Sequence, residues 1–398
     1  MASIWNPHFN ALSGEYLFVA SAKEAKAYRE SNPKLPLVSL GIGDVTRPLP
    51  QVIVDAIQKA ALEMGAPATF RGYPPDGGYP FLREAIARYY RSLGIRLSPD
   101  EIFISDGAKS DLGGILELFG DIPLLLPDPT YPVLRDAALL AGREVWYLPL
   151  TAEDGWVPTP EGLPMRPYII YLCSPNNPTG VAYTKSQLAA WVRYARESGS
   201  VILYDAAYGA FASGAVPASI YQMRGSERCA IEIGSFSKMA GFTGMRCGWS
   251  ILPKALDGKE CSPRALWARR QGSRFNGVGY VISRAAEAAL SPQGRMGSAQ
   301  AIHYYGENLA ALRTCLDAKG IPYFGGKDAP YLWVKTPLGM SSQEAFRYLL
   351  WEHGILVTPG SGFGKAGEGY LRLSAFASHE DTAEAVKRLE SLSYPIST

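Results

Sequence analysis

Residues 230–249 read Ala230-Ile231-Glu232-Ile233-Gly234-Ser235-Phe236-Ser237-Lys238-Met239-Ala240-Gly241-Phe242-Thr243-Gly244-Met245-Arg246-Cys247-Gly248-Trp249. The first six are typical of a buried strand. A lysine just after such a strand can lose contact with water, which lowers its pKa and frees the amine to form a Schiff base. Ser235, Ser237 and Arg246 could together hold a dianionic phosphate. A lone lysine here would simply be an exposed loop residue, so the interpretation depends on the whole set.

Apolar runs of the same kind recur between residues 102 and 252. The other predicted strands are 102–105, 123–126, 144–147, 169–173, 201–204 and 247–252. Helical periodicity lies between several of them, for example over 110–119 and 185–197. Strands that are apolar throughout and alternate with helices are typical of a mostly parallel sheet covered on both faces. The sequence therefore predicts an α/β fold with a central sheet between helices.

The segments before residue 102 and after residue 252 predict further helices, two further strands and the domain limits. Helical periodicity is expected over 51–64, 81–93, 263–274, 278–290 and 297–319. Strands 331–335 and 370–374, a helix over 341–353 between them and a last helix indicate a smaller α+β domain. We expect an N-terminal arm with part of the small domain over 1–45, a large domain over 46–290 and a small C-terminal domain over 291–398.

Composition and charge narrow the class of protein. The chain has 398 residues, 47% of them hydrophobic, and a formal net charge of +2. So small a charge argues against a main partner that is nucleic acid or an anionic membrane. Five cysteines and four histidines lack the spacing of a disulfide framework or a metal site. Without a membrane-length apolar run or a signal-like N-terminus, we expect a cytoplasmic enzyme.

Polar side chains follow two of the predicted strands. Asp205 comes directly after strand 201–204, at the edge where α/β sheets bind ligands, and Tyr208 lies three residues further on. A buried carboxylate there needs a cationic partner such as a protonated pyridine nitrogen, although a helix N-cap would also explain it. Asn177 follows strand 169–173 in the turn Asn-Asn-Pro-Thr-Gly, where its amide can point at a ring oxygen.

Other segments offer further ligand contacts. Strand 102–105 leads into a helix near Ala108 and Lys109, and the first backbone N–H groups of that helix form an anion site. Tyr131 offers a flat face for a ring. Arg372, inside an alternating strand, needs a carboxylate partner from a ligand or from a structural salt bridge. Two glycine-rich loops, 41–43 and 360–365, lack essential positions of nucleotide-binding motifs and are interpreted as turns.

Together these motifs resemble those of pyridoxal-phosphate (PLP) aminotransferases of fold type I, class I/II. The segments occur in the family's order between residues 105 and 372. A closer similarity, over nearly the whole chain, is to the LL-diaminopimelate aminotransferases; it is carried by segments 41–49, 70–73, 105–109, 204–208, 241–244, 275–277 and 358–364. The sequence departs from the family pattern at Cys247, where an aliphatic residue is preferred, and at Asp76 and Gly209, where Glu is usual.

The resemblance implies how the chain holds the cofactor. Lys238 would form the Schiff base and then move the proton, and Asp205 would keep the pyridine nitrogen protonated. Asn177 and Tyr208 would bind the ring oxygen O3′, and Tyr131 would stack on the ring. The remaining cofactor contacts would come from Ala108, Lys109, Ser235, Ser237, Arg246 and Asn276, with Tyr73 reaching in from the partner subunit.

The resemblance also implies the substrate site. Arg372 would bind the substrate α-carboxylate. The other substrate contacts would be Tyr16, Gly43, Asp76, Lys109, Tyr131, Asn177 and Asn276. Among these Asp76 is our candidate partner for the distal ammonium of LL-diaminopimelate, because an unpaired buried charge is costly. Asp76 could instead only cap the turn before Gly77 and Gly78.

The implied reaction is reversible amino transfer between glutamate and tetrahydrodipicolinate, which gives LL-2,6-diaminopimelate on the route to lysine and cell wall. The implied assembly is a homodimer with shared active sites. Another aminotransferase, for aspartate or aromatic substrates, or a C–S lyase would carry the same cofactor motifs. A PLP-sensing regulator would need a DNA-binding module, and no basic helix-turn-helix pattern precedes residue 45. A nucleotide-binding protein without PLP is disfavoured by the two incomplete glycine-rich motifs.

Overall fold

The computed structural model describes residues 4–12, 14–33, 35–259, 261–337 and 339–392. Its largest sheet has seven strands. Their spatial order is β2 (Ile102–Ser105), β8 (Gly248–Ile251), β7 (Ala230–Ser235), β6 (Val201–Asp205), β5 (Ile169–Cys173), β3 (Leu124–Asp128) and β4 (Val145–Pro149). Strand β8 runs antiparallel to both neighbours, and the other pairs are parallel. The predicted mostly parallel sheet is confirmed.

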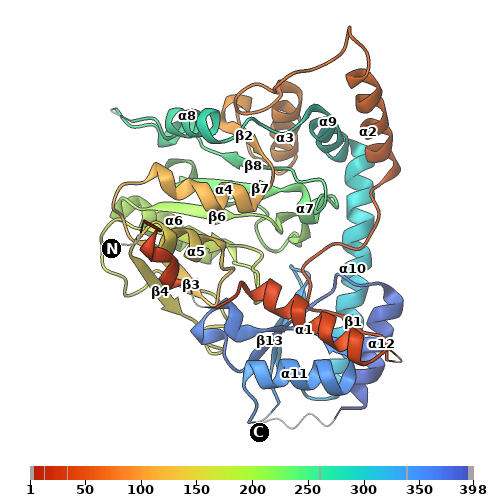
Figure 1. The fold of residues 1–398 in the computed structure, drawn as a ribbon. Helices are drawn as coiled ribbons and strands as arrows, with labels where there is room; N and C mark the ends of the chain where they lie inside the picture. The colour runs from red at the N-terminus through yellow and green to blue at the C-terminus, as the bar shows by residue number, and fades with distance from the viewer. Residues whose placement is uncertain (1–3, 13, 34, 260, 338, 393–398) are drawn as a thin grey trace.

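Helices cover both faces of this sheet (Figure 1). In β5 the side chains of Ile169 and Tyr171 pack on one face, whereas Ile170 and Leu172 pack on the other, as the two-residue repeat of a strand requires. The first face is covered by α4 (Ala108–Ile115), α5 (Val133–Leu140) and α8 (Pro263–Arg274). The second is covered by α6 (Lys185–Ser198). Burial on both faces explains why the central strands are apolar throughout.

The β2–β8 edge has its own helical cover. Side chains of this edge share one apolar cluster with α2 (Gln51–Met64), α3 (Pro80–Ser92), α7 (Phe236–Met239) and α9 (Tyr280–Ala289). In this cluster Trp249 of β8 packs against Phe236, with the ring centroids 4.9 Å apart. Packing of Phe236 fixes the short helix α7, which carries Lys238.

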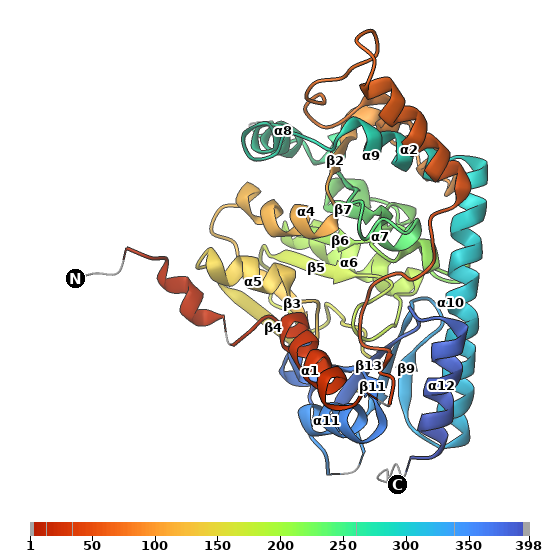
Figure 2. The ribbon, with the colours of Figure 1, turned by 45° about the vertical axis from the view of Figure 1, so that its right-hand side comes forward.

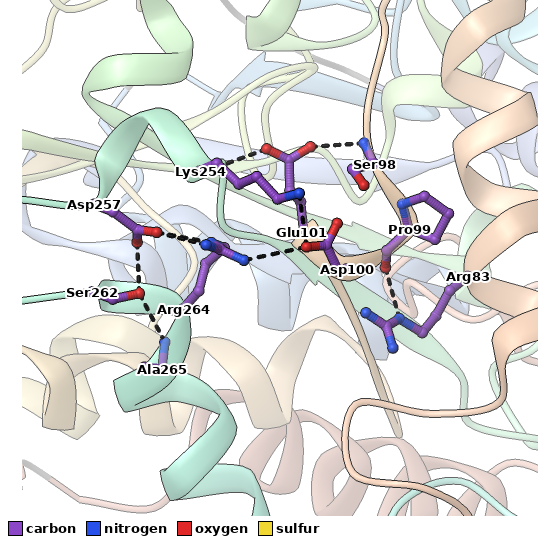
Figure 3. Close-up of polar contacts among 10 residues, drawn as sticks. All are labelled: Arg83, Ser98, Pro99, Asp100, Glu101, Lys254, Asp257, Ser262, Arg264 and Ala265. Atoms are coloured by element: carbon purple, nitrogen blue, oxygen red, sulfur yellow. Dashed lines mark hydrogen bonds and ion pairs between the residues drawn. The ribbon is translucent and has the colours of Figure 1, made fainter.

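A charged surface cluster ties this edge to α8 (Figure 3). Lys254 forms an ion pair with Asp100 at 2.9 Å, and Arg264 bonds Asp257 at 2.6 Å. Glu101 also accepts a hydrogen bond from the backbone N–H of Lys254 at 2.7 Å. An exposed pair such as Lys254 and Asp100 contributes about 1 kcal/mol or less, so this cluster is not the main source of stability at this edge.

A second, smaller set of strands packs beside the large sheet. It contains an antiparallel sheet in the order β12 (Thr358–Pro359), β13 (Tyr370–Ser374), β10 (Tyr331–Lys335) and β9 (Tyr323–Gly325), and a parallel pair β1 (Val38–Ser39) and β11 (Ile355–Leu356). Its helices are α1 (Leu17–Ser31), α11 (Ser342–His353) and α12 (His379–Glu390). The long helix α10 (Pro292–Ala318) runs from α9 to α12 and so borders both sheets (Figures 1 and 2).

Every strand and helix predicted from the sequence is present, with ends shifted by a few residues. One shift affects the site: α4 begins at Ala108 rather than at residue 110, so the N–H groups of Ala108 and Lys109 lie in its first turn. The sequence did not predict α1, α5, α7, β1, β9, β11 or β12. The domain limits near residues 45 and 290 stay a prediction. No helix in the described part of the chain has the length and apolar character needed to cross a membrane.

Candidate active site

A cavity of about 690 Å³ opens at the carboxyl ends of the parallel strands, next to the smaller sheet. Loops after five strands, β2, β3, β5, β6 and β7, contribute to its wall, as expected for a ligand site in an α/β sheet. The predicted residues that line it are Gly43, Ala108, Lys109, Tyr131, Asn177, Asp205, Tyr208, Ser235, Ser237, Lys238, Arg246 and Arg372. Residues separated by more than 300 positions in the chain therefore meet in one cavity, from Gly43 to Arg372.

Lys238 lies in α7, directly after the buried strand β7. Its Nζ donates a hydrogen bond to the backbone oxygen of Gly43. Burial lowers the pKa of Lys238 to about 8; the carboxylate of Asp44 opposes the shift, and Arg372 and Arg246 add to it. A substantial fraction of the amine is therefore neutral near physiological pH, which a nucleophile or a proton acceptor requires.

The end of the cavity at α4 forms a cradle for an anion. Arg246 donates to Ser237 Oγ at 3.0 Å, and the backbone N–H of Ser237 donates to Ser235 Oγ at 3.1 Å. Arg246 has a left-handed backbone, with φ of 62°, a strained conformation that is enriched at functional sites. A Cβ on Gly107 would lie 2.4 Å from Arg246 Nη2, so only glycine allows this approach. Hydroxyls, a guanidinium and a helix N-terminus fit the phosphate of PLP.

Asp205 ends β6 and is only 5% exposed. Its oxygens accept hydrogen bonds from the Tyr171 hydroxyl at 2.9 Å and the Ala207 N–H at 3.0 Å. Burial raises the pKa of this carboxyl, and these two hydrogen bonds oppose the shift. Neither contact supplies a positive charge, so the carboxylate fits a protonated ring nitrogen in the cavity.

Asn177 joins the two ends of the site. Its Nδ2 donates to the Tyr208 hydroxyl at 3.4 Å, and its Oδ1 accepts from Arg372 at 2.8 Å. The Tyr208 hydroxyl also bonds the Tyr331 hydroxyl at 2.7 Å. The side chains predicted to bind the ring oxygen and the substrate carboxylate are thus part of one hydrogen-bonded network.

Arg372 is fully buried in β13, yet its hydrogen bonds within the described residues go to neutral oxygens. Its Nη2 donates to the backbone oxygen of Gly41 at 2.7 Å, while its Nε has no hydrogen-bond partner in the part of the chain that the structure describes. The structural salt bridge considered from the sequence is therefore absent from the described part of the chain. A buried guanidinium with an unused donor at a cavity is suited to bind a ligand carboxylate.

Tyr131 lies in the wall after β3, and two predicted residues lie next to it. The Tyr16 hydroxyl donates to the Tyr131 hydroxyl at 3.4 Å, and Lys109 Nζ donates to Tyr16 at 3.1 Å. Burial raises the pKa of both tyrosines, so both hydroxyls stay protonated. Tyr16 does not itself line the cavity, whereas the nearby Phe18 does.

Tyr73, Asp76 and Asn276 do not line the cavity of their own chain. Tyr73 is 85% exposed, and Asp76 and Asn276 are also exposed. The loop that holds Tyr73 and Asp76 packs beside residues 272–277, because a Cβ on Gly277 would lie 2.4 Å from Pro74 and one on Gly272 would lie 3.6 Å from Asp76. These residues could contribute to a site only across a subunit interface.

Sequence reasoning missed several residues of the site. Tyr171 bonds Asp205, Tyr331 bonds Tyr208, and Asp44 acts on Lys238 through its charge. Tyr171 and Tyr331 look like ordinary apolar strand positions in the sequence. Asp44 itself lines the cavity next to Gly43, but no local motif links it to Lys238.

Comparison with known proteins agrees with this geometry. The family described as aminotransferase class I and II matches residues 36–389. The chain is 48% identical to an LL-diaminopimelate aminotransferase of Agathobacter rectalis and 45% identical to one of Bacteroides fragilis, over 97% of its length and 99% and 98% of theirs. A solved L,L-diaminopimelate aminotransferase from Chlamydomonas reinhardtii superimposes with a TM-score of 0.92 at 39% identity, covering 99% of both chains. The chain belongs to the class I and II aminotransferases.

Proposed function

We propose that the protein is a PLP-dependent aminotransferase that transfers an amino group from LL-2,6-diaminopimelate to 2-oxoglutarate, reversibly giving tetrahydrodipicolinate, glutamate and water. The observation that carries the chemistry is one cavity holding an amine of lowered pKa, a buried carboxylate and a buried arginine that binds no carboxylate of the described chain. The choice of LL-diaminopimelate follows the relatives named above, which match this chain over nearly its whole length.

Each part of the cavity has a task in this proposal. The cradle of Ser235, Ser237, Arg246 and the start of α4 holds the phosphate, and Asp205 keeps the ring nitrogen protonated. Bound PLP supplies an electron-accepting ring. Lys238 holds the cofactor and then moves the proton at the substrate α-carbon, since its amine can both give and take a proton near neutral pH. Asn177, Tyr208 and Tyr131 orient the ring.

The direct test incubates purified, cofactor-loaded protein with LL-diaminopimelate and 2-oxoglutarate and measures the glutamate formed. Parallel reactions replace the amino donor with aspartate or phenylalanine, and another follows pyruvate release from a cysteine thioether. We expect the highest kcat/KM with LL-diaminopimelate. A higher value with aspartate or phenylalanine would assign another aminotransferase, and pyruvate release as the main reaction would assign a C–S lyase.

Replacing Arg372 with lysine should weaken substrate binding while leaving the cofactor in place. Lysine keeps the charge but cannot bind a carboxylate with two parallel hydrogen bonds. We expect a loss of about 1.5–3 kcal/mol, which is roughly 10-fold to 150-fold in substrate affinity. Substrate titration of the visible cofactor band measures this affinity.

Arg143→Lys is the matched control for Arg372→Lys. The Arg143 guanidinium also donates to backbone oxygens, among them Gly120 and Ile122 at 2.6 Å, but outside the cavity. This variant should lose stability and keep its substrate affinity. Unchanged affinity in Arg372→Lys would show that Arg372 only supports the fold.

The proposal includes a homodimer in which Tyr73 completes the partner's site. If so, mixing inactive Lys238→Ala subunits with inactive Tyr73→Phe subunits should restore activity, because one site of each hybrid has both natural residues. With random exchange, about one quarter of wild-type activity is expected. Tyr73→Phe must first prove inactive alone. No recovery after subunit exchange verified by mass spectrometry would place Tyr73 in its own chain's site or outside any site.

Asp76 is proposed to pair with the distal ammonium of LL-diaminopimelate across the same interface. Asp76→Asn should raise the KM for LL-diaminopimelate several-fold and change the KM for glutamate little, because glutamate has no such ammonium. Asp76→Glu, which keeps the charge, should stay close to wild type. If Asp76→Asn and Asp76→Glu change KM alike, or if the KM values of both substrates change equally, Asp76 only caps the turn before Gly77 and Gly78.

Two wider expectations belong to the same proposal. The enzyme would act in the cytoplasm, and its domains would be the large unit 46–290 and the small unit 291–398 with residues from the N-terminal 45. The β1–β11 pairing supports assigning part of the N-terminal segment to the small unit.

A further inference from the structure

We propose that Tyr331 is a positioning residue for Tyr208: its hydroxyl donates to the Tyr208 oxygen and thereby directs the Tyr208 proton toward the cofactor. This inference rests on the proposed cofactor but not on which amino acid is the substrate. Like Arg372, Tyr331 brings a side chain of the smaller sheet to the candidate site, and none of the sequence motifs predicted to bind the cofactor contains it.

The contact joins the two sheets. Tyr331 opens strand β10, and Tyr208 follows strand β6 of the large sheet. Their hydroxyl oxygens are 2.7 Å apart, and their rings meet edge to face with centroids 5.3 Å apart. Tyr331 is fully buried, and in the described structure its hydroxyl has no hydrogen-bond partner other than Tyr208.

Two glycines, Gly43 and Gly180, allow close packing around Tyr331. A Cβ on Gly43 would lie 2.8 Å from the Tyr331 hydroxyl oxygen, so a glycine at 43 leaves room for that hydroxyl. A Cβ on Gly180, which ends the Asn-Asn-Pro-Thr-Gly turn, would lie 2.2 Å from the backbone oxygen of Tyr331. The turn that carries Asn177 thus packs directly on β10, which carries Tyr331. This contact fixes the two hydrogen-bond partners of Tyr208 relative to each other.

The number of donors and acceptors around the Tyr208 hydroxyl determines the direction of its hydrogen bonds when the ring oxygen of the cofactor is bound nearby. Asn177 Nδ2 can only donate, and it points at the Tyr208 oxygen at 3.4 Å. If Tyr331 donates as well, both acceptor positions of that oxygen are filled, and the single Tyr208 proton must point into the cavity. Burial raises the pKa of Tyr331, so this phenol retains its proton for donation. The Arg372 guanidinium lies 4.5 Å from the Tyr331 ring centre, and its charge strengthens the donor.

A hydrogen bond that Tyr208 donates to the ring oxygen of the cofactor favours the deprotonated form of that oxygen and lowers the apparent pKa of the visible absorption band. Donation by Tyr331 makes Tyr208 a stronger donor, because hydrogen bonds in a chain polarise one another. Losing the Tyr331 hydroxyl should therefore raise the apparent pKa of the band.

The test is a spectrophotometric pH titration of the PLP-loaded protein and of its variants. Tyr331→Phe should raise the apparent pKa of the visible band by roughly 0.3–1 unit, the equivalent of one ordinary hydrogen bond. Tyr208→Phe should raise it more. The double variant should match Tyr208→Phe alone, because Tyr331 acts through Tyr208.

Tyr194→Phe is the matched control, since Tyr194 lies on α6 and its part-buried hydroxyl donates to Pro164 O at 2.7 Å, outside the cavity. Tyr194→Phe should lose about as much stability as Tyr331→Phe but leave the apparent pKa of the visible band unchanged. If Tyr331→Phe does not fold, 3-fluorotyrosine at position 331 keeps the hydroxyl and makes it a stronger donor, so the apparent pKa should fall. An unshifted band, or a Tyr331 effect that persists without Tyr208, would overturn the inference. A wild-type protein that forms no visible band with PLP would instead overturn the proposed function.

Discussion

Replacing Lys238 with alanine should abolish nearly all turnover while the protein still folds and binds PLP. The phosphate cradle and Asp205 remain in this variant, so the cofactor keeps most of its contacts. The variant lacks the amine that follows β7 and with it the group that moves the substrate proton. Loss of positioned proton transfer alone lowers a rate on the order of 10²–10⁴-fold. Steady-state kinetics measures the loss, and borohydride treatment should no longer fix the cofactor to the peptide that contains residue 238.

Lys254→Ala supplies the matched control for this experiment. Lys254 belongs to the charged surface cluster and pairs with Asp100 (Figure 3). The Lys254→Ala variant should keep full turnover, and borohydride treatment should still fix the cofactor to Lys238. If borohydride fixes the cofactor to another lysine of the wild-type protein, Lys238 is not the residue that binds the cofactor covalently.

The pH dependence of cofactor capture follows from the same residue. Below about pH 8 most of the Lys238 amine carries a proton, and the fraction that is free to attack the cofactor aldehyde grows as the pH rises. Capture of PLP by cofactor-free protein should therefore accelerate with rising pH and level off above about 8. An acceleration that continues to the range of an ordinary lysine, about 10.4, would mean that burial does not lower this pKa.

Much of the site could be predicted because it follows one rule of α/β folds. Strands β2, β5, β6 and β7 were recognisable as apolar runs, and their carboxyl ends meet at one edge of the sheet. Residues just after those strands, such as Asn177, Asp205 and Lys238, were therefore expected to meet. The cavity contains all three.

The elements that the sequence did not predict lack a strong local signal. Helix α1 begins after Tyr16 without a side-chain cap, and among its residues only Ala25 and Tyr28 are buried. Strands β1, β11 and β12 have two residues each, so their pairing depends on tertiary contacts rather than on periodicity. The same limit applies to Tyr171 and Tyr331, because their roles arise from partners 34 and 123 positions away.

Replacing Asp205 with asparagine is the second change for which we expect a large effect. Asparagine has nearly the same size. Its oxygen can still accept from the Ala207 N–H, and its Nδ2 can donate to the Tyr171 hydroxyl oxygen, but it has no charge to hold a proton on the ring nitrogen. Removing one charge-stabilising group from an active site typically lowers kcat on the order of 10²–10³-fold. We expect a loss of this size, with a smaller change in cofactor affinity, measured by kinetics and by PLP titration.

Glu232→Gln tests whether such a loss is specific to Asp205. Glu232 is fully buried on the neighbouring strand β7, and burial raises its pKa to about 7. It bonds Tyr90, Ser219 and the Ile220 N–H, outside the cavity. The same change from carboxyl to amide should therefore alter stability but leave kcat close to wild type. If both variants lose turnover equally, a buried carboxylate in this sheet matters for the fold, and Asp205 has no separate role at the ring nitrogen.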